Sequence, residues 1–275
     1  MAEVAKQTLT GWGKIVRLVD RLWAPLLGLV EVIGVHVQLF SRAVFWLFKP
    51  PFRVAVFIDA AEFIGVQSLL IVSMVGMFVG MVFALQLTSA LRQFGTESFI
   101  GATLGLALTR ELAPVFTAIV VAARAGAGMA TELGSMRITE QVDALATMAV
   151  NPIQYLVTPR ILAATIMVPL LCMLFNCVGM LGGYGVAVWY EGVDRGVFIE
   201  NARWIVDHKD IVQGLIKATV FGCALSLISC CQGYFASGGA KGVGIGTTRA
   251  VVGSFVTILV LDYFLTDVIL AIQGK

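Results

Sequence analysis

Long stretches without charged residues divide this chain. The two clearest stretches are 63–91 and 161–190, and each lies between charged residues. Three further stretches, 98–123, 211–235 and 250–272, carry only one or two charged positions each. An α-helix needs about 20 mostly apolar residues to cross roughly 30 Å of hydrocarbon, so the pattern predicts five transmembrane helices.

The first part of the chain shows a different pattern. Apolar residues between 12 and 26 recur at three- and four-residue steps, while Lys14, Arg17 and Arg21 fall on the opposite face. This spacing is typical of an amphipathic helix that lies in the plane of the lipid headgroups. We therefore expect an interfacial anchor at this end.

The stretch 26–48 is ambiguous. It is apolar enough for a sixth crossing, but polar residues such as Glu31 and Arg42 are spread through it, and Lys49-Pro50-Pro51 ends it. We favour a helix that lies in the membrane surface and leave a crossing open.

The expected fold is therefore an all-α integral membrane protein. Residues 1–60 form an N-terminal interfacial amphipathic segment, and residues 61–275 form a transmembrane domain with five spans. Composition agrees, because 59% of the 275 residues are hydrophobic and only 13% are charged, against about 25% charged in soluble domains. The net charge of +2 is too small to indicate nucleic-acid binding.

Basic residues predict the orientation. Twelve Lys and Arg residues fall in the N-terminal segment and the connections 124–160 and 236–249, whereas the opposite side carries five. Cytoplasmic loops carry an excess of basic residues. This distribution predicts a cytoplasmic N-terminus and a C-terminus on the outer side of the membrane.

Motifs for enzymatic chemistry are missing from the sequence. It contains no phosphate-binding G-x-x-x-x-G-K-[ST] loop and no H-E-x-x-H motif, and its histidines are His36 and His208. The five cysteines lie in apolar runs without the spacing of metal ligands. We predict a non-enzymatic protein without a metal or cofactor, in which any ATP and Mg²⁺ are bound by a separate subunit.

The pair Arg110-Glu111 is the most informative polar feature. A helix that begins near Ser98 places this pair about 18 Å deep, close to the middle of the bilayer. Ionisable side chains there must face water, protein or each other. We favour the polar lining of a substrate pathway over a buried ion pair that locks helices. Lys217 and Asp262 are candidates for the same network, although Lys217 lies early enough in its helix to snorkel outward.

The connection after the second span has an amphipathic pattern. Glu140, Gln141 and Asp143 alternate with apolar Val142 and Leu145, which predicts a helix at about 134–148. Such a helix can be a solvated connector, but its apolar stripe favours docking into the groove of a partner.

Pairs of small residues indicate close contacts between helices. Gly76/Gly80, Gly101/Gly105 and Gly179/Gly183 have the spacing that lets helix backbones approach closely in lipid. We interpret them as packing sites within the chain, with a dimer contact as the alternative.

Several ordered motifs resemble the MlaE family of ABC-transporter permeases, and together they extend over roughly residues 40–272. They are Arg-Glu-Leu-Ala-Pro-Val at 110–115, Ala-Arg-Ala-Gly-Ala-Gly-Met-Ala-Thr-Glu-Leu-Gly-Ser-Met-Arg at 123–137, Thr-Glu-Gln-Val-Asp-Ala-Leu at 139–145, Met-Ala-Val-Asn-Pro at 148–152, Thr-Thr-Arg-Ala-Val-Val at 247–252 and Leu-Asp-Tyr-Phe-Leu-Thr at 261–266.

The resemblance implies a homodimeric permease that moves phospholipid between the inner and outer membranes of a Gram-negative-type envelope. Its implied partners are a cytoplasmic ABC ATPase, a periplasmic MCE-domain protein and a STAS-domain protein.

The resemblance also implies roles for individual residues. It assigns Glu140, Gln141, Asp143 and Leu145 to ATPase coupling, Arg110, Glu111, Phe83, Leu91, Phe94, Leu112 and Lys217 to lipid binding, and Asp262 to a structural ionic contact.

Two other classes of function stay open. An ion-coupled secondary transporter would use Arg110, Glu111, Lys217 and Asp262 as a relay. A non-transporting anchor would only hold a periplasmic ring in place.

Overall fold

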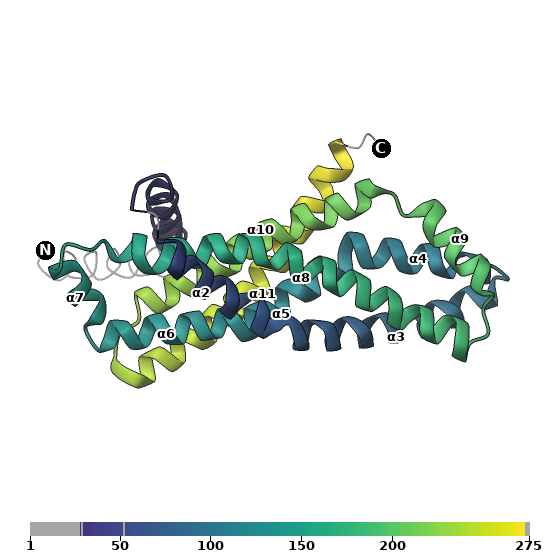
Figure 1. The fold of residues 1–275 in the computed structure, drawn as a ribbon, viewed down its shortest axis with the longest axis horizontal. Helices are drawn as coiled ribbons and strands as arrows, with labels where there is room; N and C mark the ends of the chain where they lie inside the picture. Colours follow the sequence, from purple (N-terminus) through teal and green to yellow (C-terminus); the bar gives the residue numbers. More distant parts are fainter. Residues whose placement is uncertain (1–27, 29, 52, 273–275) are drawn as a thin grey trace, which may run out of the picture.

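The computed structural model describes residues 28, 30–51 and 53–272, and within them every regular element is helical. Figure 1 shows an elongated bundle in which most helices follow the long axis. The elements are a helix at Val30–Leu47, α2 (Val54–Ile64), η1 (Val66–Ser68), α3 (Leu69–Gln93), η2 (Glu97–Phe99), α4 (Ile100–Ala107), η3 (Leu108–Leu112), α5 (Ala113–Val121), η4 (Ala122–Gly126), α6 (Ala127–Ile138), α7 (Gln141–Thr147), η5 (Ile153–Val157), α8 (Thr158–Tyr184), η6 (Gly185–Tyr190), α9 (Arg195–Ile205), α10 (His208–Tyr234) and α11 (Gly239–Ile272).

Apolar helices are found at all five predicted spans. The helical runs are longer than the charge-free stretches, and the second, Glu97–Ile138, contains 42 residues. At about 1.5 Å per residue, this run is roughly 63 Å long, about twice the thickness of the hydrocarbon layer. Part of the second span therefore extends beyond the hydrocarbon.

The helix Val30–Leu47 is also long and apolar enough to cross a membrane. In Figure 1 its dark purple ribbon lies across the long axis of the bundle, near the end that carries α7. Leu39 and Ala43 of this helix are buried, and the Thr158 hydroxyl donates to the carbonyl of Ala43 at 3.3 Å. This crosswise packing is consistent with a helix in the membrane surface, and the choice between lying and crossing stays a prediction. The amphipathic pattern at 12–26 lies outside the described residues.

The boundary predicted between residues 60 and 61 lies inside α2, so α2 belongs to both predicted parts.

Four helical segments have π geometry, in which one extra residue is accommodated per turn. Two of them, η3 and η4, interrupt the second long run. The other two, η5 and η6, begin and end the third long run. Such insertions are frequent at functional sites, and η3 contains both Arg110 and Glu111.

The expected single helix at 134–148 is wrong in its boundaries. The second long run ends at Ile138, and the short helix α7 begins at Gln141. Between them Glu140 has a left-handed backbone with φ of 61°, which a continuing α-helix cannot contain. Figure 1 shows α7 at one extreme of the bundle and α9 at the other.

The predicted small-residue contacts lie within the chain. A Cβ added to Gly80 of α3 would lie 2.0 Å from the carbonyl oxygen of Gly179 in α8. On α4, a Cβ added to Gly101 would lie 2.3 Å from the carbonyl oxygen of Phe198 in α9. The glycines therefore permit backbone contact between α3 and α8 and between α4 and α9, which confirms the intrachain interpretation.

Helix α11 differs from the other long helices because little of it is covered. Only 6% of its most apolar stretch is buried, against 50% for α10. Large apolar residues such as Val256, Leu259 and Phe264 are more than half exposed. A broad face of α11 is therefore without a protein neighbour in the described part of the chain.

Candidate functional site

Lys217 is the centre of an ionic cluster inside the bundle. Its side chain is 0% exposed, which excludes the outward snorkelling considered from the sequence. Its Nζ donates to Oε2 of Glu111 at 2.5 Å, to Oδ1 of Asp262 at 2.9 Å and to the hydroxyl oxygen of Thr266 at 2.7 Å. An ammonium group has three donors, so these contacts satisfy it completely. The cluster joins η3, α10 and α11.

Arg110 makes a separate ion pair with α10. Its Nε donates to Oδ1 of Asp210 at 2.8 Å, and its Nη2 lies 2.7 Å from the same oxygen. The other oxygen of Asp210 accepts from the backbone N–H of Asp207 at 2.9 Å, which completes a capping box at the start of α10. One carboxylate therefore both caps α10 and holds Arg110.

Local backbone features bring η3 and α10 together. A Cβ on Gly214 would lie 2.1 Å from the carbonyl oxygen of Thr109, so only glycine permits this approach. Asp210 and Lys217 lie on either side of Gly214, about two helical turns apart. The adjacent residues Arg110 and Glu111 can therefore bond to α10 one above the other.

The cluster is buried on one side and open on the other. The side chains of Arg110 and Glu111 are 38% and 41% exposed, whereas that of Asp210 is 5% exposed. Two charged side chains thus reach the surface of the single chain within a membrane-capable helix. Charged groups at such a depth must face water or protein, because contact with lipid tails costs several kcal/mol.

The structure contains features of both interpretations of Arg110-Glu111, the buried ion pair and the lining of a substrate pathway. The contacts to Lys217 and Asp210 are those of an ionic lock between helices. The exposed sides of Arg110 and Glu111 leave the substrate pathway as a prediction. Asp262 accepts from Lys217 in this cluster, and the structural role that the resemblance implies for it stays a prediction.

The four predicted apolar lining residues do not share one environment. Phe83, Leu91 and Leu112 are half-buried and pack against the core, whereas Phe94 ends α3 and is 78% exposed. Their role in lipid binding stays a prediction. A separate apolar cavity of about 700 Å³ lies between α4, α8 and α9, and neither the cluster residues nor these four line it.

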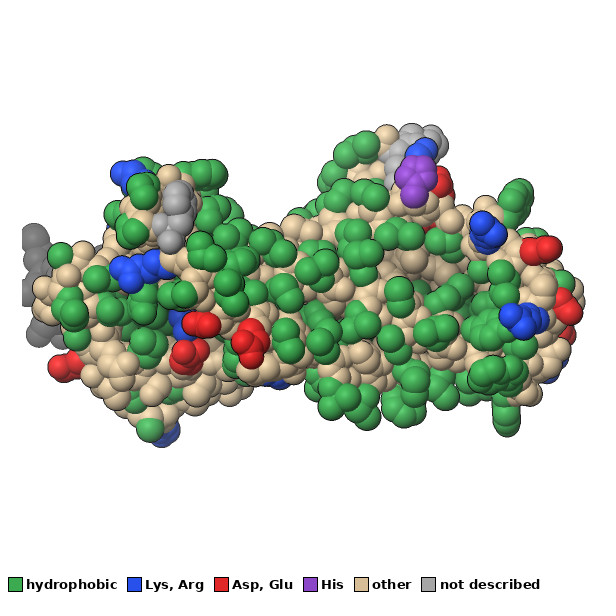
Figure 2. Space-filling model, viewed as in Figure 1, with side chains coloured by type: hydrophobic (Ala, Val, Ile, Leu, Met, Phe, Trp, Pro, Cys, Tyr) green, Lys and Arg blue, Asp and Glu red, His purple; other side chains and the backbone are tan. Residues whose placement is uncertain are grey.

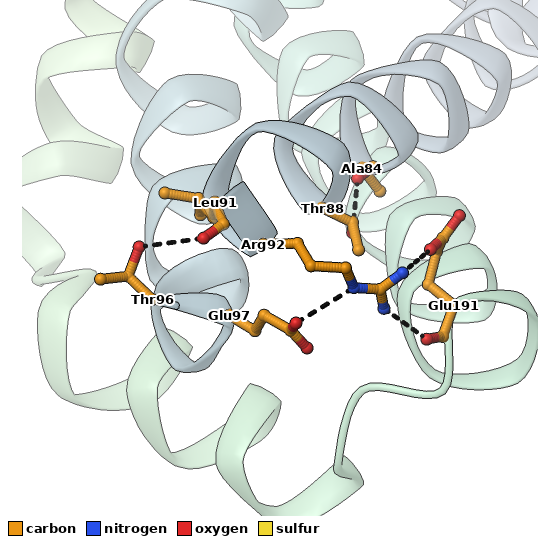
Figure 3. A network of polar contacts seen from close by, with 7 residues as sticks. All are labelled: Ala84, Thr88, Leu91, Arg92, Thr96, Glu97 and Glu191. Carbon is orange, nitrogen blue, oxygen red and sulfur yellow. Dashed lines mark hydrogen bonds and ion pairs between the residues drawn. The ribbon is translucent and has the colours of Figure 1, made fainter. Parts of the chain in front are cut away.

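An ion-pair network joins the helix ends near α9. Figure 3 shows the Arg92 guanidinium between two carboxylates, Glu97 after the α3–α4 turn and Glu191 after η6. The distances are 3.0 Å to Glu97 and 3.1 Å to Glu191, and Arg92 also donates to the backbone carbonyl of Glu191 at 3.0 Å. The network fastens the α3–α4 turn to the end of the third long run.

The predicted coupling residues lie on or beside α7. Val142 is buried and Leu145 is half-buried against the core, so the apolar stripe faces this chain. Glu140, Gln141 and Asp143 are exposed, and Asp143 pairs with Arg137 at 2.5 Å. The exposed polar face is therefore the part of α7 that is free to meet a partner.

Sequence reasoning missed several polar contacts. The span predicted at 211–235 begins after Asp210, whereas α10 begins at His208 and contains Asp210. The Asp-x-x-Asp spacing at 207–210 was a detectable capping signal. Arg124, in η4, donates to the Phe63 carbonyl at 2.5 Å and to the side chains of Gln67 and Ser68, and nothing in the spacing pointed to these partners.

Comparisons with known proteins identify the family of this chain. The family described as Permease MlaE matches residues 57–268. A probable ABC transporter permease protein of Rickettsia prowazekii is 40% identical over 253 residues, which are 88% of this chain and 98% of the relative. The intermembrane phospholipid transport system permease protein MlaE of Haemophilus influenzae is 37% identical over 255 residues, which are 88% of this chain and 98% of that relative.

A plant protein is also similar to this chain. The chloroplastic protein trigalactosyldiacylglycerol 1 of Arabidopsis thaliana is 40% identical over 203 residues, which are 74% of this chain and 58% of that protein. The family match covers most of the chain, including the ionic cluster and α7. This chain is therefore a multi-pass membrane permease and belongs to the MlaE family.

Proposed function

We propose that this permease is the membrane subunit of an ABC transporter that moves phospholipids between the inner and outer membranes of a Gram-negative-type envelope. The observation that carries the proposal is the pair Arg110 and Glu111, which are about 40% exposed and are the charged residues in the stretch 98–123. A phospholipid has two apolar chains and one charged head, so its pathway needs mostly apolar walls and a few ionic groups.

The names of two relatives support this substrate. The Haemophilus relative is called an intermembrane phospholipid transport permease, and the Rickettsia relative a probable ABC transporter permease. Arg110 suits a phosphate, because Nη1 of its guanidinium makes no hydrogen bond and no ion pair with the described part of the chain.

A homodimer would enclose the exposed charges. The uncovered face of α11 adjoins the ionic cluster through Asp262 and Thr266. A second copy packed there would leave Arg110 and Glu111 in a cavity between protomers, where water or a lipid head can reach them. We place the lipid pocket in this cavity.

The other partners follow from the two ends of the bundle. We propose that a cytoplasmic ABC ATPase, which binds ATP and Mg²⁺, contacts the exposed face of α7. A periplasmic MCE-domain protein would meet the end that carries α9, and a STAS-domain protein would join through the ATPase. The N-terminus is then cytoplasmic and the C-terminus periplasmic, in the inner membrane.

ATP-driven closure of the ATPase would act through α7 on the second long helix, which continues from α6 to η3. Movement of that helix would shift the population between open and collapsed forms of the central cavity. Lipid would leave when the collapsed form predominates.

Transfer between vesicles tests this function. The permease is reconstituted with its ATPase and MCE partners, and transfer of a fluorescent phospholipid is measured with ATP, without ATP, and with an ion gradient alone. We expect transfer only with ATP. Arg110→Gln should lower it about tenfold, because charge-assisted hydrogen bonds are worth roughly 1.5–3 kcal/mol and about 1.4 kcal/mol is a factor of ten.

Lys209→Gln, which changes an exposed cation in the first turn of α10, is the matched control and should transfer lipid normally. Transfer that needs only the ion gradient would favour a secondary transporter. An assembled complex that transfers no lipid under any condition would favour a non-transporting anchor.

A further inference from the structure

A second polar site lies far from the ionic cluster, between α2, α6 and the start of α8. It is a cavity of about 320 Å³. Most of its wall is apolar, and three charged side chains, Asp59, Glu132 and Arg160, complete it. The apolar wall residues include Val56, Phe63, Ile64, Met129 and Met136.

Aromatic and basic side chains surround the cavity. Tyr155 lines it, and the Arg53 guanidinium lies 4.5 Å from the centre of that ring. Nearby, Lys49 lies 5.7 Å from the ring of Trp46, and its carbonyl accepts from the side-chain amide of Gln154 at 2.9 Å. Aromatic residues accompanied by Lys and Arg are typical of the membrane–water interface.

The surface around this cavity is visible in Figure 2. Acidic and basic side chains gather there over α2 and α6, whereas the middle of the same face is largely apolar. The gathering lies toward the end of the bundle that carries α7.

The charges at the cavity are arranged as a pair with one carboxylate left over. Arg160 is 12% exposed, and its Nη2 lies 3.0 Å from Oε1 of Glu132 while its Nη1 donates to the Leu156 carbonyl at 2.8 Å. Its Nε makes no hydrogen bond and no ion pair with the described residues. Asp59 has neither an ion pair nor a hydrogen bond to any residue that the structure describes. The cavity thus offers a spare guanidinium donor and a spare carboxylate.

This combination matches a zwitterion. The remaining donor of Arg160 suits a phosphate oxygen, and the carboxylate of Asp59 suits an ammonium group. One face of each aromatic ring in the wall already carries a guanidinium, since Arg124 lies 4.9 Å from the centre of the Phe63 ring and Arg53 covers Tyr155. An aromatic cage for a quaternary ammonium is therefore incomplete, and a hydrogen bond from a primary ammonium to Asp59 is favoured.

We infer that this cavity binds the headgroup of a phosphatidylethanolamine-type phospholipid from the leaflet on the α7 side. The phosphate contacts Arg160, the primary ammonium contacts Asp59, and the apolar wall holds the upper acyl chain. The inference rests on the proposed function only in taking a bilayer phospholipid as the ligand and the α7 end as the cytoplasmic one. It adds an inner-leaflet docking site at the opposite end of the bundle from α9.

Photo-cross-linking tests the site directly. The full-length permease carries p-benzoylphenylalanine in place of Val56, a wall residue, and is placed in nanodiscs of palmitoyl-oleoyl phosphatidylethanolamine, phosphatidylcholine or phosphatidylglycerol. Mass spectrometry then measures the lipid adduct at position 56. We expect about tenfold more adduct with phosphatidylethanolamine than with either other lipid, as a charge-assisted hydrogen bond predicts.

Two variants make the result specific. Asp59→Asn should remove the preference and keep the melting temperature, because Asp59 has no partner to lose among the described residues. Glu62→Gln, one turn further along α2 and outside the cavity wall, should keep the preference. Equal adducts with all three lipids, an unchanged preference in Asp59→Asn, or a cross-link to residues 1–27 in place of lipid would each overturn the inference.

The two proposals can fail separately. ATP-dependent transfer without any lipid preference at position 56 would remove this site and leave the proposed function. If the lipid preference at position 56 depends on Asp59 but the permease never transfers lipid, the headgroup site stands and the proposed function fails.

Discussion

Replacing Lys217 by Met tests whether the ionic cluster locks the bundle. Met keeps an unbranched apolar side chain of similar reach but removes the ammonium group. The carboxylates of Glu111 and Asp262, which lie 2.5 and 2.9 Å from that group, then lose their counter-charge inside the helix bundle. We expect the folded state to lose stability for this reason.

The magnitude follows from the burial of the three groups. Removing one partner of a buried ion pair costs about 3–5 kcal/mol. Glu111 is 41% and Asp262 is 22% exposed, so screening by solvent brings the expected loss to the lower end, about 3 kcal/mol. One kcal/mol corresponds to about 2–4 °C in a chain of this size, so the melting temperature should fall by roughly 6–12 °C.

The assay is thermal unfolding in detergent, followed by tryptophan fluorescence. Lys209→Met, which removes an exposed cation from the same helix, is the control and should melt within about 2 °C of the unchanged protein. A triple variant with Lys217→Met, Glu111→Gln and Asp262→Asn should recover most of the loss, because it leaves no uncompensated charge. The lock is refuted if Lys217→Met melts like the control, or if the triple variant melts lower than the single one.

Three further predictions concern other parts of the bundle. Gly80→Ala should lower the free energy of unfolding by about 1–3 kcal/mol, because the added Cβ clashes with the backbone of the neighbouring helix. Gly185→Ala is the control and should leave this free energy unchanged, because a Cβ there meets only ordinary contacts. Equal unfolding curves for the two variants would contradict the prediction. Glu140→Lys should abolish co-purification of the ATPase in a pull-down. Glu200→Lys, an exposed position on α9 at the opposite end of the bundle, should preserve it, so normal association of Glu140→Lys would argue against docking at α7. Arg92→Ala should change stability by less than about 1 kcal/mol but accelerate hydrogen–deuterium exchange at 92–99, and unchanged exchange would show that the network does not hold that turn.

Much of the fold was predictable because membrane spans depend on local composition. A charge-free stretch must be covered by lipid or protein wherever it lies, so the five spans followed from length and polarity alone. The pair Arg110-Glu111 stood out for the same reason, as charge in an apolar helix needs a partner. The glycine pairs also gave the correct interpretation, because only small residues let helices touch in lipid.

Contacts that depend on three-dimensional register could not be predicted. The sequence identified Lys217 and Asp262 as candidates, but the pairing of Arg110 with Asp210 depends on how far α10 extends and on the close approach at Gly214. The end of the helix before Glu140 could not be predicted, because a left-handed backbone is unusual for a glutamate. The pairing of Arg160 with Glu132 joins helices whose order around the bundle is not encoded in periodicity.

The π geometry of η3 has a consequence for insertions and deletions. A π turn holds one residue more than an α turn, so removing a single residue between Leu108 and Leu112 would restore regular α geometry. The helical segments on either side would keep their register, but neighbouring side chains within the turn would then lie about 100° apart around the helix axis. Arg110 and Glu111 could then no longer both face α10. Among related permeases, a one-residue gap at this turn should therefore disturb transport more than a gap of the same size in a surface loop.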